Sequence, residues 1–480
     1  MKNTTPFLKT FGPLLFGRKA APRLPAGEEL GELYDIFESL IPTSLFERPS
    51  KGANSRQRTL PPEVTFWAFL SQALSPGSSC REVVRKLEAW WHWSGLNRPA
   101  TVSESAYCQA RKRLPKATLH HVFKHTGLVL DRNVLQQENI IPGRRVRVVD
   151  GTMLSMPDTS ENQQCWPQSS GQKPGLGFPL LKMVSLFSLE SGGMTDYAIG
   201  NLHQHESNLF RSLWPQLDRG DIVLGDRAFC SYGTLAMLQS QGNDGVFRLH
   251  QKRRIDFREG TRLGEDDRLV VWSKPAQRPA GLTPEEHLAL PATLQVRMIR
   301  LRVEVPGYRS QAVTLVTTLT DPVTYPAETL RKLYGCRWQV ELNIAQIKTT
   351  LGLDILRCRT PALIDKEVLI HLIAYNMVRG LMQQSAHHYH ATLNRISFKG
   401  TIDTVRHYAR PIHLARKQPA KAKQLISKMM ELIVLDAVPD RPGRSEPRAK
   451  KRRAKNYHLL TKPRKKMKLT NHRNRAKAAK

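Results

Sequence analysis

The sequence has no long apolar run. No stretch approaches the roughly 18 consecutive apolar residues that a membrane-spanning helix needs. The most apolar segment, residues 368–382, is interrupted by histidine, asparagine and arginine, and it predicts a buried helix. A short apolar stretch near the N-terminus is broken by Lys9 and Pro13, so it lacks the uninterrupted core of a signal peptide. We therefore expect a cytoplasmic protein with no membrane partner.

Cysteine is also scarce. The 480 residues include only six cysteines, and no two of them form a Cys-x-x-Cys pair. This spacing argues against a zinc knuckle, a redox motif and a disulfide-stapled scaffold, and it suits reduced thiols in a cytoplasm. None of the six is a candidate for catalysis. Hydrophobic residues make up 40% of the chain, which is enough to bury a sizeable core.

Acidic residues are few compared with basic ones. Lys and Arg number 74 against 41 Asp and Glu, which gives a formal charge of +33 and a pI of about 10.2. Such a charge calls for a polyanion, either nucleic acid or an anionic membrane. The last 40 residues carry 17 basic residues and one acid, yet the preceding 440 still carry +17. Because the body is basic as well as the tail, extended contact with nucleic acid is favoured.

The order of periodic segments predicts an α/β fold. Between residues 140 and 250, apolar patterns indicate five strands, three of them before the first helix, and this order favours a mixed sheet. A long helix is expected from Ala327 to Leu351. The expected divisions are an unclear segment at 1–60, a helical region at 61–134, an α/β domain at 140–250 and 326–385, a β-rich insertion at 251–325, a helical region at 386–440, and a basic tail at 441–480 that is disordered without its partner.

Two helices in the region 61–134 resemble a helix-turn-helix. Ser79 can cap the first, a Gly-containing connection follows, and the second carries Arg111, Lys112 and Arg113. These three basic residues are candidates for DNA contact. The alternative is an ordinary helical hairpin with a solvated basic face, because no base-contacting pattern is visible.

Three acids are candidates for metal binding. Asp150 and Asp226 each follow a predicted strand, where carboxylates point into the ligand-binding crevice of an α/β sheet, and Glu341 lies in the long helix. Two aspartates and a glutamate can hold two divalent cations for a phosphoryl displacement. Oxygen-only ligands suit Mg²⁺, with Mn²⁺ as a substitute, rather than zinc. The alternative for either aspartate is that it only terminates a strand or caps a helix.

The helix around Glu341 adds a polar stripe. Tyr334, Arg337 and Lys348 fall within about 60° of one another and of Glu341 on a regular helix of 100° per residue. An acid beside two bases and a phenol suits a metal-bound phosphodiester, with the bases on neighbouring phosphates. The alternative is a solvated face with an Arg337–Glu341 pair, worth about 0.2–0.5 kcal/mol.

These residues carry a family resemblance. Tyr334-x2-Arg337-x3-Glu341-x6-Lys348 resembles the Tyr-Arg-Glu-Lys (YREK) signature of bacterial insertion-sequence DDE transposases. The segment Asp150-Gly151-Thr152 is similar to their first catalytic block, and residues 225–229 are similar to their second. The resemblance implies a ribonuclease H-like catalytic domain, interrupted by the β-rich insertion and preceded by a DNA-binding region.

The resemblance also implies roles for individual residues. Asp150, Asp226 and Glu341 would be the metal-binding catalytic triad for two Mg²⁺ ions, while Tyr334, Arg337 and Lys348 would hold phosphates of the transposon end. Some relatives stack a flipped base on a tryptophan of the insertion, where Trp272 is the one candidate, although a strand tryptophan is usually core. The implied partners are the terminal inverted repeats and the target DNA, bound by a homodimer that pairs two ends.

Three functions remain open from the sequence. The first is a transposase that cuts its own ends and transfers them to target DNA. The second keeps the fold but makes it a structure-selective nuclease or resolvase without strand transfer. The third is a DNA-binding repressor with a decayed active site. The intact acids and the polar stripe favour the first function over the third.

Overall fold

A computed structural model provides the structure of the chain. No helix in the described part is long and apolar enough to cross a membrane. Most of the predicted segment 1–60 and of the basic tail lies outside the described residues. The structure describes residues 58–93, 102–134, 139–250, 256–279, 281–303 and 311–439, together with residues 37, 41, 46, 55, 56, 253, 462, 463, 466 and 467.

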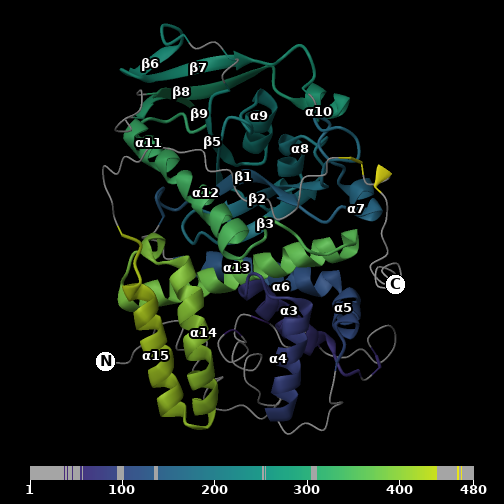
Figure 1. The fold of residues 1–480 in the computed structure, drawn as a ribbon. Coiled ribbons are helices and arrows are strands. Elements are labelled where there is room, and N and C mark those ends of the chain that lie inside the picture. The colour runs from purple at the N-terminus through teal and green to yellow at the C-terminus, as the bar shows by residue number, and fades with distance from the viewer. Residues whose placement is uncertain are drawn as a thin grey trace.

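The N-terminal part is helical, as the sequence predicts. Helix α5 begins after Ser103, whose hydroxyl accepts a hydrogen bond from the backbone N–H of Ala106. Helix α6 follows after Pro115 and packs against strand β3 and helix α13. Figure 1 shows these helices below the sheet. Their bounds are α3 Pro62–Leu74, α4 Cys80–Trp93, α5 Glu104–Arg113 and α6 Lys116–Arg132.

A nine-stranded mixed sheet forms the centre of the fold, in the order β3-β2-β1-β4-β5-β9-β8-β7-β6. The first three strands are antiparallel, whereas β4 and β5 run parallel to β1. This arrangement confirms the predicted α/β class with a mixed sheet. The bounds are β1 Val146–Ser155, β2 Leu180–Ser188, β3 Met194–Gly200, β4 Ile222–Gly225, β5 Asp244–Arg248, β6 Thr261–Gly264, β7 Asp267–Ser273, β8 Thr293–Val303 and β9 Gln311–Thr317.

The β-rich insertion extends the central sheet. Strand β9 pairs with β5 along one edge and with β8 along the other, so the inserted strands continue the hydrogen-bonded ladder. A buried ion pair, Arg297 with Asp267 at 2.6 Å, joins β8 to β7. The insertion also holds a short helix, α10 (Pro284–Ala289), that the sequence patterns do not predict. Its Thr283 and Glu286 form a capping box.

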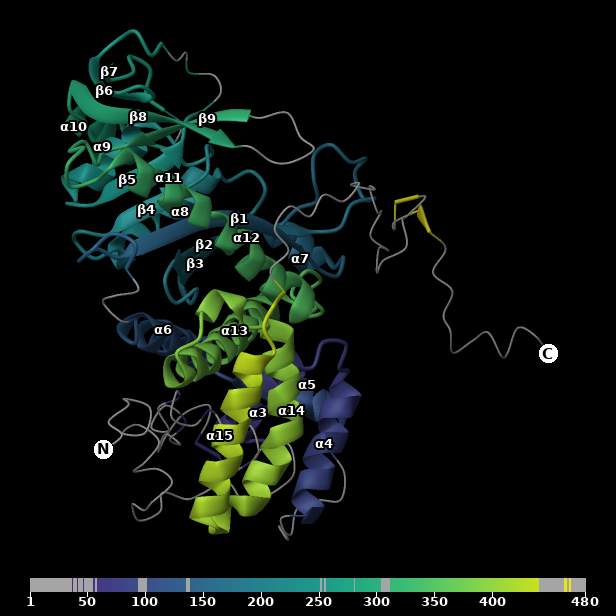
Figure 2. The same ribbon diagram turned by 90° about the vertical axis from the view of Figure 1, so that its left-hand side faces the viewer.

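Helices cover both faces of the sheet (Figures 1 and 2). Alternate residues of β1 separate the two cores: Val148 packs with the helices α6, α11, α12 and α13, and Val149 packs with α8 and α9. The remaining helix bounds are α7 Ser160–Cys165, α8 Glu206–Arg211, α9 Tyr232–Ser240, α11 Ala327–Cys336, α12 Trp338–Ala345, α13 Pro361–Tyr389, α14 Phe398–Leu414 and α15 Pro419–Leu435.

Helix α13 joins the sheet to both helical regions. It is buried along most of its 29 residues and packs against α3, α6, α14 and α15. Its polar side chains bind the β2–β3 turn: Asn376 donates to the carbonyl of Met194 at 2.9 Å, and Arg379 donates to the carbonyl of Ser191 at 2.6 Å. The most apolar segment of the chain is therefore a buried helix, as predicted.

The long helix expected from 327 to 351 is divided. Helix α11 ends at Cys336, Arg337 keeps helical dihedral angles, and α12 continues to Ala345. A π-helical turn, Gln346–Thr350, ends the segment. Wider turns of this kind occur inside helices near functional sites, and here the turn changes the direction of Lys348 relative to a regular helix.

Candidate active site

Asp150 and Asp226 lie side by side on the sheet. Val148 of β1 pairs with Leu224 of β4 in parallel register, so two residues further along each strand Asp150 lies opposite Asp226. Both carboxylates point to the face that α12 covers, because Val148 and Leu224 belong to that core. Asp150 lies inside β1, which runs on to Ser155, whereas the sequence pattern predicts that it ends the strand.

Local hydrogen bonds fix both aspartates. The Oδ1 atom of Asp150 accepts from the backbone N–H of Gly151 at 2.8 Å. The Oδ1 atom of Asp226 accepts from the N–H of Ala228 at 2.7 Å, which closes the turn after β4. Each carboxylate therefore keeps oxygen lone pairs for a further ligand.

The polar stripe of α11 and α12 lies next to these aspartates. Arg337 Nη2 donates to Glu341 Oε1 at 2.7 Å, and its guanidinium lies 5.8 Å from the ring centroid of Tyr334. The side chains of Arg337 and Glu341 are 16% and 35% exposed, so the pair borders solvent. The phenol of Tyr334 has a raised pKa, chiefly because it is buried, and the charge of Asp226 adds to that rise.

The pKa of Asp150 reports the charge around the site. Its pKa is raised to about 6, chiefly by burial and also by the negative charges of Asp226 and Glu341, although the Gly151 N–H and the charge of Arg337 lower it. Asp226 and Glu341 are therefore both within electrostatic reach of Asp150. An excess of negative charge in a half-buried site is the condition under which a divalent cation binds.

The carboxylates are the type of ligand that a hard divalent cation prefers, although they do not form a complete coordination shell. The candidate ligands are all oxygen atoms, as Mg²⁺ and Mn²⁺ prefer. Across the part of the chain that the structure describes, no group of three acidic, histidine or cysteine side chains stands ready to enclose an ion. Glu341 is engaged by Arg337, so a cation that recruits Glu341 has to displace that guanidinium.

Lys348 points back to β1. Its ammonium donates to the carbonyl of Met153 at 3.0 Å and pairs with Asp354 at 3.2 Å. Met153 lies three residues after Asp150 on the same strand, so Lys348 reaches the strand that carries the first aspartate. The π-helical turn places it there, and both of its partners lie at the edge of the site.

Arg248 is a neighbour that the sequence motifs do not reveal. Gly225 of β4 pairs with Phe247 of β5, so continuing this register places Arg248 opposite Asp226. Its positive charge lowers the pKa of Tyr334, which confirms that it is near the stripe. The signal available in the sequence is its position at the end of a strand parallel to β4.

The three basic residues of α5 have different environments. Arg111 is only 7% exposed, and its guanidinium lies over the rings of Phe69 and Tyr107 at 5.0 and 4.9 Å. It packs the helical region and, as it lies, offers no donor to DNA. Lys112 is exposed and Arg113 half-buried, so both stay available as predicted DNA contacts.

Trp272 lies in the core of the insertion. Its side chain on β7 is 7% exposed, and the guanidinium of Arg253 lies 3.7 Å from its ring centroid. A base could stack on this ring only after Arg253 moved away. Base stacking at Trp272 therefore stays a prediction, and the geometry favours the packing role that a strand tryptophan usually has.

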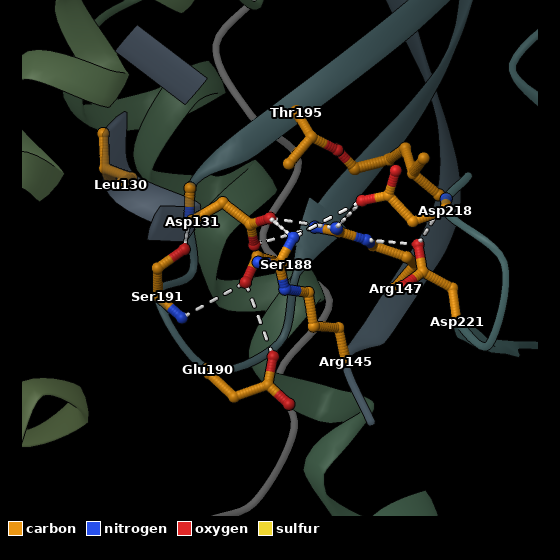
Figure 3. A network of polar contacts seen from close by, with 12 residues as sticks. Leu130, Asp131, Arg145, Arg147, Ser188, Glu190, Ser191, Thr195, Asp218 and Asp221 are labelled. Atoms are coloured by element: carbon orange, nitrogen blue, oxygen red, sulfur yellow. Dashed lines mark hydrogen bonds and ion pairs between the residues drawn. The ribbon is translucent and has the colours of Figure 1, made fainter. Parts of the chain in front are cut away.

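A second charged cluster lies at the start of β1, and Figure 3 shows it from close by. Arg147 is bound by Asp131 of α6 at 2.8 Å and by Asp221, which precedes β4, at 2.9 Å. Arg145 pairs with the same Asp131 at 3.0 Å. Burial raises the pKa of the adjacent Glu190 to about 7. This network links the last turn of α6 to strand β1.

Comparison with known families agrees with this architecture. Residues 141–377 match the family described as "Transposase DDE domain", and residues 28–124 match "Insertion element 4 transposase N-terminal". The first match contains Asp150, Asp226 and Glu341. Together the two matches cover more than two thirds of the chain.

Individual relatives point the same way. The chain is 28% identical to "Transposase InsG for insertion sequence element IS4" of Escherichia coli (strain K12), over 84% of this chain and 88% of that protein. It is 25% identical to "Transposase for insertion sequence element IS421" of Escherichia coli, over 70% and 89%. A solved chain of the piggyBac transposase synaptic complex with hairpin DNA has a TM-score of 0.41 and 10% identity, covering 87% of this chain and 84% of that one. From the two family matches and the two sequence relatives, the chain belongs to the IS4 family of DDE transposases, the enzymes of insertion sequence elements.

Proposed function

We propose that this transposase cuts DNA at the ends of its own insertion sequence and transfers those ends to target DNA, with Asp150, Asp226 and Glu341 as its catalytic carboxylates. One observation carries the proposal: continuing the strand register brings Asp150 opposite Asp226, and the charges of Asp226 and of Glu341 on α12 both act on Asp150. The family resemblance independently selects the same three residues.

The three carboxylates would hold two Mg²⁺ ions, or Mn²⁺ in their place. Bound cations would supply Lewis-acid activation of the attacking oxygen and stabilisation of the leaving one. Asp150 and Asp226 contribute from one sheet face, and their turn hydrogen bonds hold the carboxylates before any ligand arrives. Glu341 would join them when Arg337 exchanges its carboxylate partner for a phosphate.

Tyr334, Arg337 and Lys348 would position the scissile end. Arg337 is already at the border of the site, and a DNA phosphate offers it the same kind of charge-assisted bond that Glu341 now provides. Lys348 would exchange its pair with Asp354 in the same way. Arg248, opposite Asp226, would add a further positive charge for the transposon backbone.

Other parts of the chain would supply affinity. Lys112 and Arg113 lie on α5 in the N-terminal region, and the whole chain is strongly basic. Phosphate contacts of this kind fix position and carry little sequence information. Two ends have to be paired for transposition, so we expect a homodimer as the active form.

The triad is tested by single substitutions. Asp150→Ala, Asp226→Ala and Glu341→Ala should each abolish cleavage of a labelled transposon end in Mn²⁺, while binding of the uncut end changes little. Lys332→Ala serves as a matched control on α11, because the Lys332 side chain is 73% exposed and its partner Glu328 is 4.0 Å away. Cleavage at the wild-type rate in a triad variant would remove that residue from the proposal.

A second arm separates transposase from nuclease. The wild-type protein with a pre-cut end and a second duplex should produce a joined product, and the triad variants should produce none. Cutting without joining, under conditions where the ends are paired, would favour the nuclease function. Binding without any cutting would favour the repressor.

If DNA is the partner, the binding affinity should depend steeply on salt concentration. Because phosphate contacts release counterions, the logarithm of affinity should fall linearly with the logarithm of salt concentration, with a slope of about −0.9 per contacted phosphate. Removing residues 441–480 should flatten that slope while preference for the transposon end remains. Complete loss of the preference would place end recognition in the tail.

A further inference from the structure

Two cysteines of the N-terminal helices and one from the catalytic domain meet around one arginine. Arg111 Nη2 lies 3.3 Å from Cys80 Sγ and 3.4 Å from Cys108 Sγ, and its Nη1 lies 3.9 Å from Cys358 Sγ. Cys80 begins α4, Cys108 lies on α5, and Cys358 precedes α13. No sequence spacing brings these thiols together, since only the packing of α5 against α4 and α13 does so.

The buried charge of Arg111 favours a nearby anion. Arg111 is buried and stays charged, yet no carboxylate pairs with it in the described part of the chain. Its flat faces lie over the rings of Phe69 and Tyr107, which offset only part of the cost of burial. The groups at its polar edge are the thiols, so the site favours a thiolate on one of them.

The two outer thiols form a pair. Cys80 Sγ and Cys108 Sγ are 3.9 Å apart, and both residues are partly exposed. The Cys80 thiol lowers the pKa of Cys108 to about 5 by hydrogen bonding, with Arg111 adding to the effect, while burial and the charge of Glu104 oppose it. The pKa of Cys80 is raised, chiefly by its hydrogen bond with Cys108 and by burial. Cys358 is buried, and its pKa is raised mainly for that reason.

We propose that Cys80 and Cys108 form an oxidisable dithiol site, with hydrogen peroxide as the oxidant, Cys108 as the attacking thiolate and Cys80 as the resolving thiol. The thiolate attacks one peroxide oxygen and the O–O bond breaks. The sulfur becomes a sulfenic acid, and the departing hydroxide takes a proton to form water. The Cys80 sulfur then attacks the Cys108 sulfur, and the hydroxyl leaves as water with the thiol proton. Two thiols are oxidised to one disulfide, and one peroxide is reduced to two waters.

The geometry needs a small movement for this step. The two sulfurs have to approach from 3.9 Å to the roughly 2.05 Å of a disulfide. Rotation of two short side chains on adjacent helices can provide it. The product joins α4 to α5 and removes the thiolate from beside Arg111.

Site-resolved alkylation tests the thiolate. The full-length protein is treated with iodoacetamide between pH 6.5 and 9, and the rate at each cysteine is followed by peptide mass spectrometry. An ordinary thiol loses reactivity about tenfold per pH unit below its pKa, so the exposed Cys165 serves as the internal reference. The rate at Cys108 should stay nearly flat over this range. A rate at Cys108 that falls in parallel with that of Cys165 would overturn the proposal.

Peroxide treatment tests the disulfide. In a Cys165→Ser background, mild hydrogen peroxide should produce a peptide cross-link between residues 80 and 108 that dithiothreitol reverses. Cys80→Ala should abolish the cross-link and let Cys108 proceed to sulfinic acid, whereas Cys336→Ser should leave it unchanged. Failure to find the 80–108 linkage, with both thiols still free to alkylate or with Cys108 directly overoxidised in the presence of Cys80, would overturn the proposal.

Discussion

Strand β1 carries two charged clusters of different character, one at its start and one in its middle. At the start of the strand, Arg147 is 4% exposed and carboxylates bind it from two sides. Three residues later, Asp150 is also largely buried, but among its hydrogen bonds in the structure only the N–H of Gly151 binds its carboxylate. In the first cluster, Arg147 and Arg145 form ion pairs with carboxylates. In the second, Arg337 pairs with Glu341, and within the described residues neither Asp150 nor Asp226 has an ion-pair partner.

The difference between the two clusters indicates which of them is suited to bind a charged ligand. Burying an ion pair costs desolvation that its own partners offset, so such a cluster has no need for an outside charge. In a cluster whose acids lack cationic partners, burial of the charges destabilises the protein without metal, and bound cations would offset that destabilisation. Strand β1 therefore carries both a structural network and a candidate catalytic site. Substitutions in the two clusters should change stability in opposite directions.

The largest change in stability should come from breaking the balanced cluster. Arg147→Met leaves Asp131 and Asp221 as buried charges without their main partner, which costs about 3–5 kcal/mol in typical cases. Urea unfolding at pH 7 measures the loss. Arg145→Met is the matched control, because that side chain is 44% exposed and should cost about 1 kcal/mol or less. Equal losses in the two variants would show that burial of Arg147 is not decisive.

In the candidate catalytic site, loss of a basic side chain should reduce the rate of the reaction more than the stability of the protein. Arg337→Ala removes a proposed phosphate contact, and misplacing the scissile phosphate by about 1 Å can cost about 100-fold in rate. The measurement is single-turnover cleavage of a labelled end in Mn²⁺, with Lys332→Ala as the control. If both variants cut equally well, the stripe is a solvated face and its match to the family signature is a coincidence of spacing.

A smaller effect of opposite sign is expected for Asp150→Asn. Because burial raises the Asp150 pKa to about 6, the native state holds this proton more tightly than the unfolded state does. The wild type therefore loses stability as the pH rises from about 4 to about 6, since one pKa unit corresponds to about 1.4 kcal/mol. Asparagine escapes this loss, so the variant should be more stable by about 1–3 kcal/mol above pH 6 in EDTA.

Thermal melting at several pH values tests that expectation. The advantage of Asp150→Asn should vanish near pH 4, where the wild-type carboxyl is protonated in both states. Millimolar Mg²⁺ should reduce the advantage at pH 8 by stabilising only the wild type. A variant that is less stable than the wild type at pH 8 without metal would show that the Asp150 charge is not costly.

Much of the fold was predictable from local pattern. The strands at 180–189 and 194–199 and the helix at 232–241 come close to the observed bounds of β2, β3 and α9, because alternation and helical spacing are local properties. The insertion was predictable as β-rich, but not its continuity with the sheet, since pairing of β9 with β5 depends on residues about 70 positions apart. The divided catalytic helix was also missed, because a π-helical turn has no pattern of its own in the apolar spacing.

The sequence by itself determined the charge of the chain, the order of its elements and the candidate triad, because composition and spacing are one-dimensional. Only the tertiary structure decided which basic residues are free: Arg111 is buried among rings and thiols, and Arg248 lies beside the site. It also brought Cys80 within 3.9 Å of Cys108, although the sequence shows no thiol pair. Burial and proximity depend on what distant segments place against a side chain, and no local pattern contains that information.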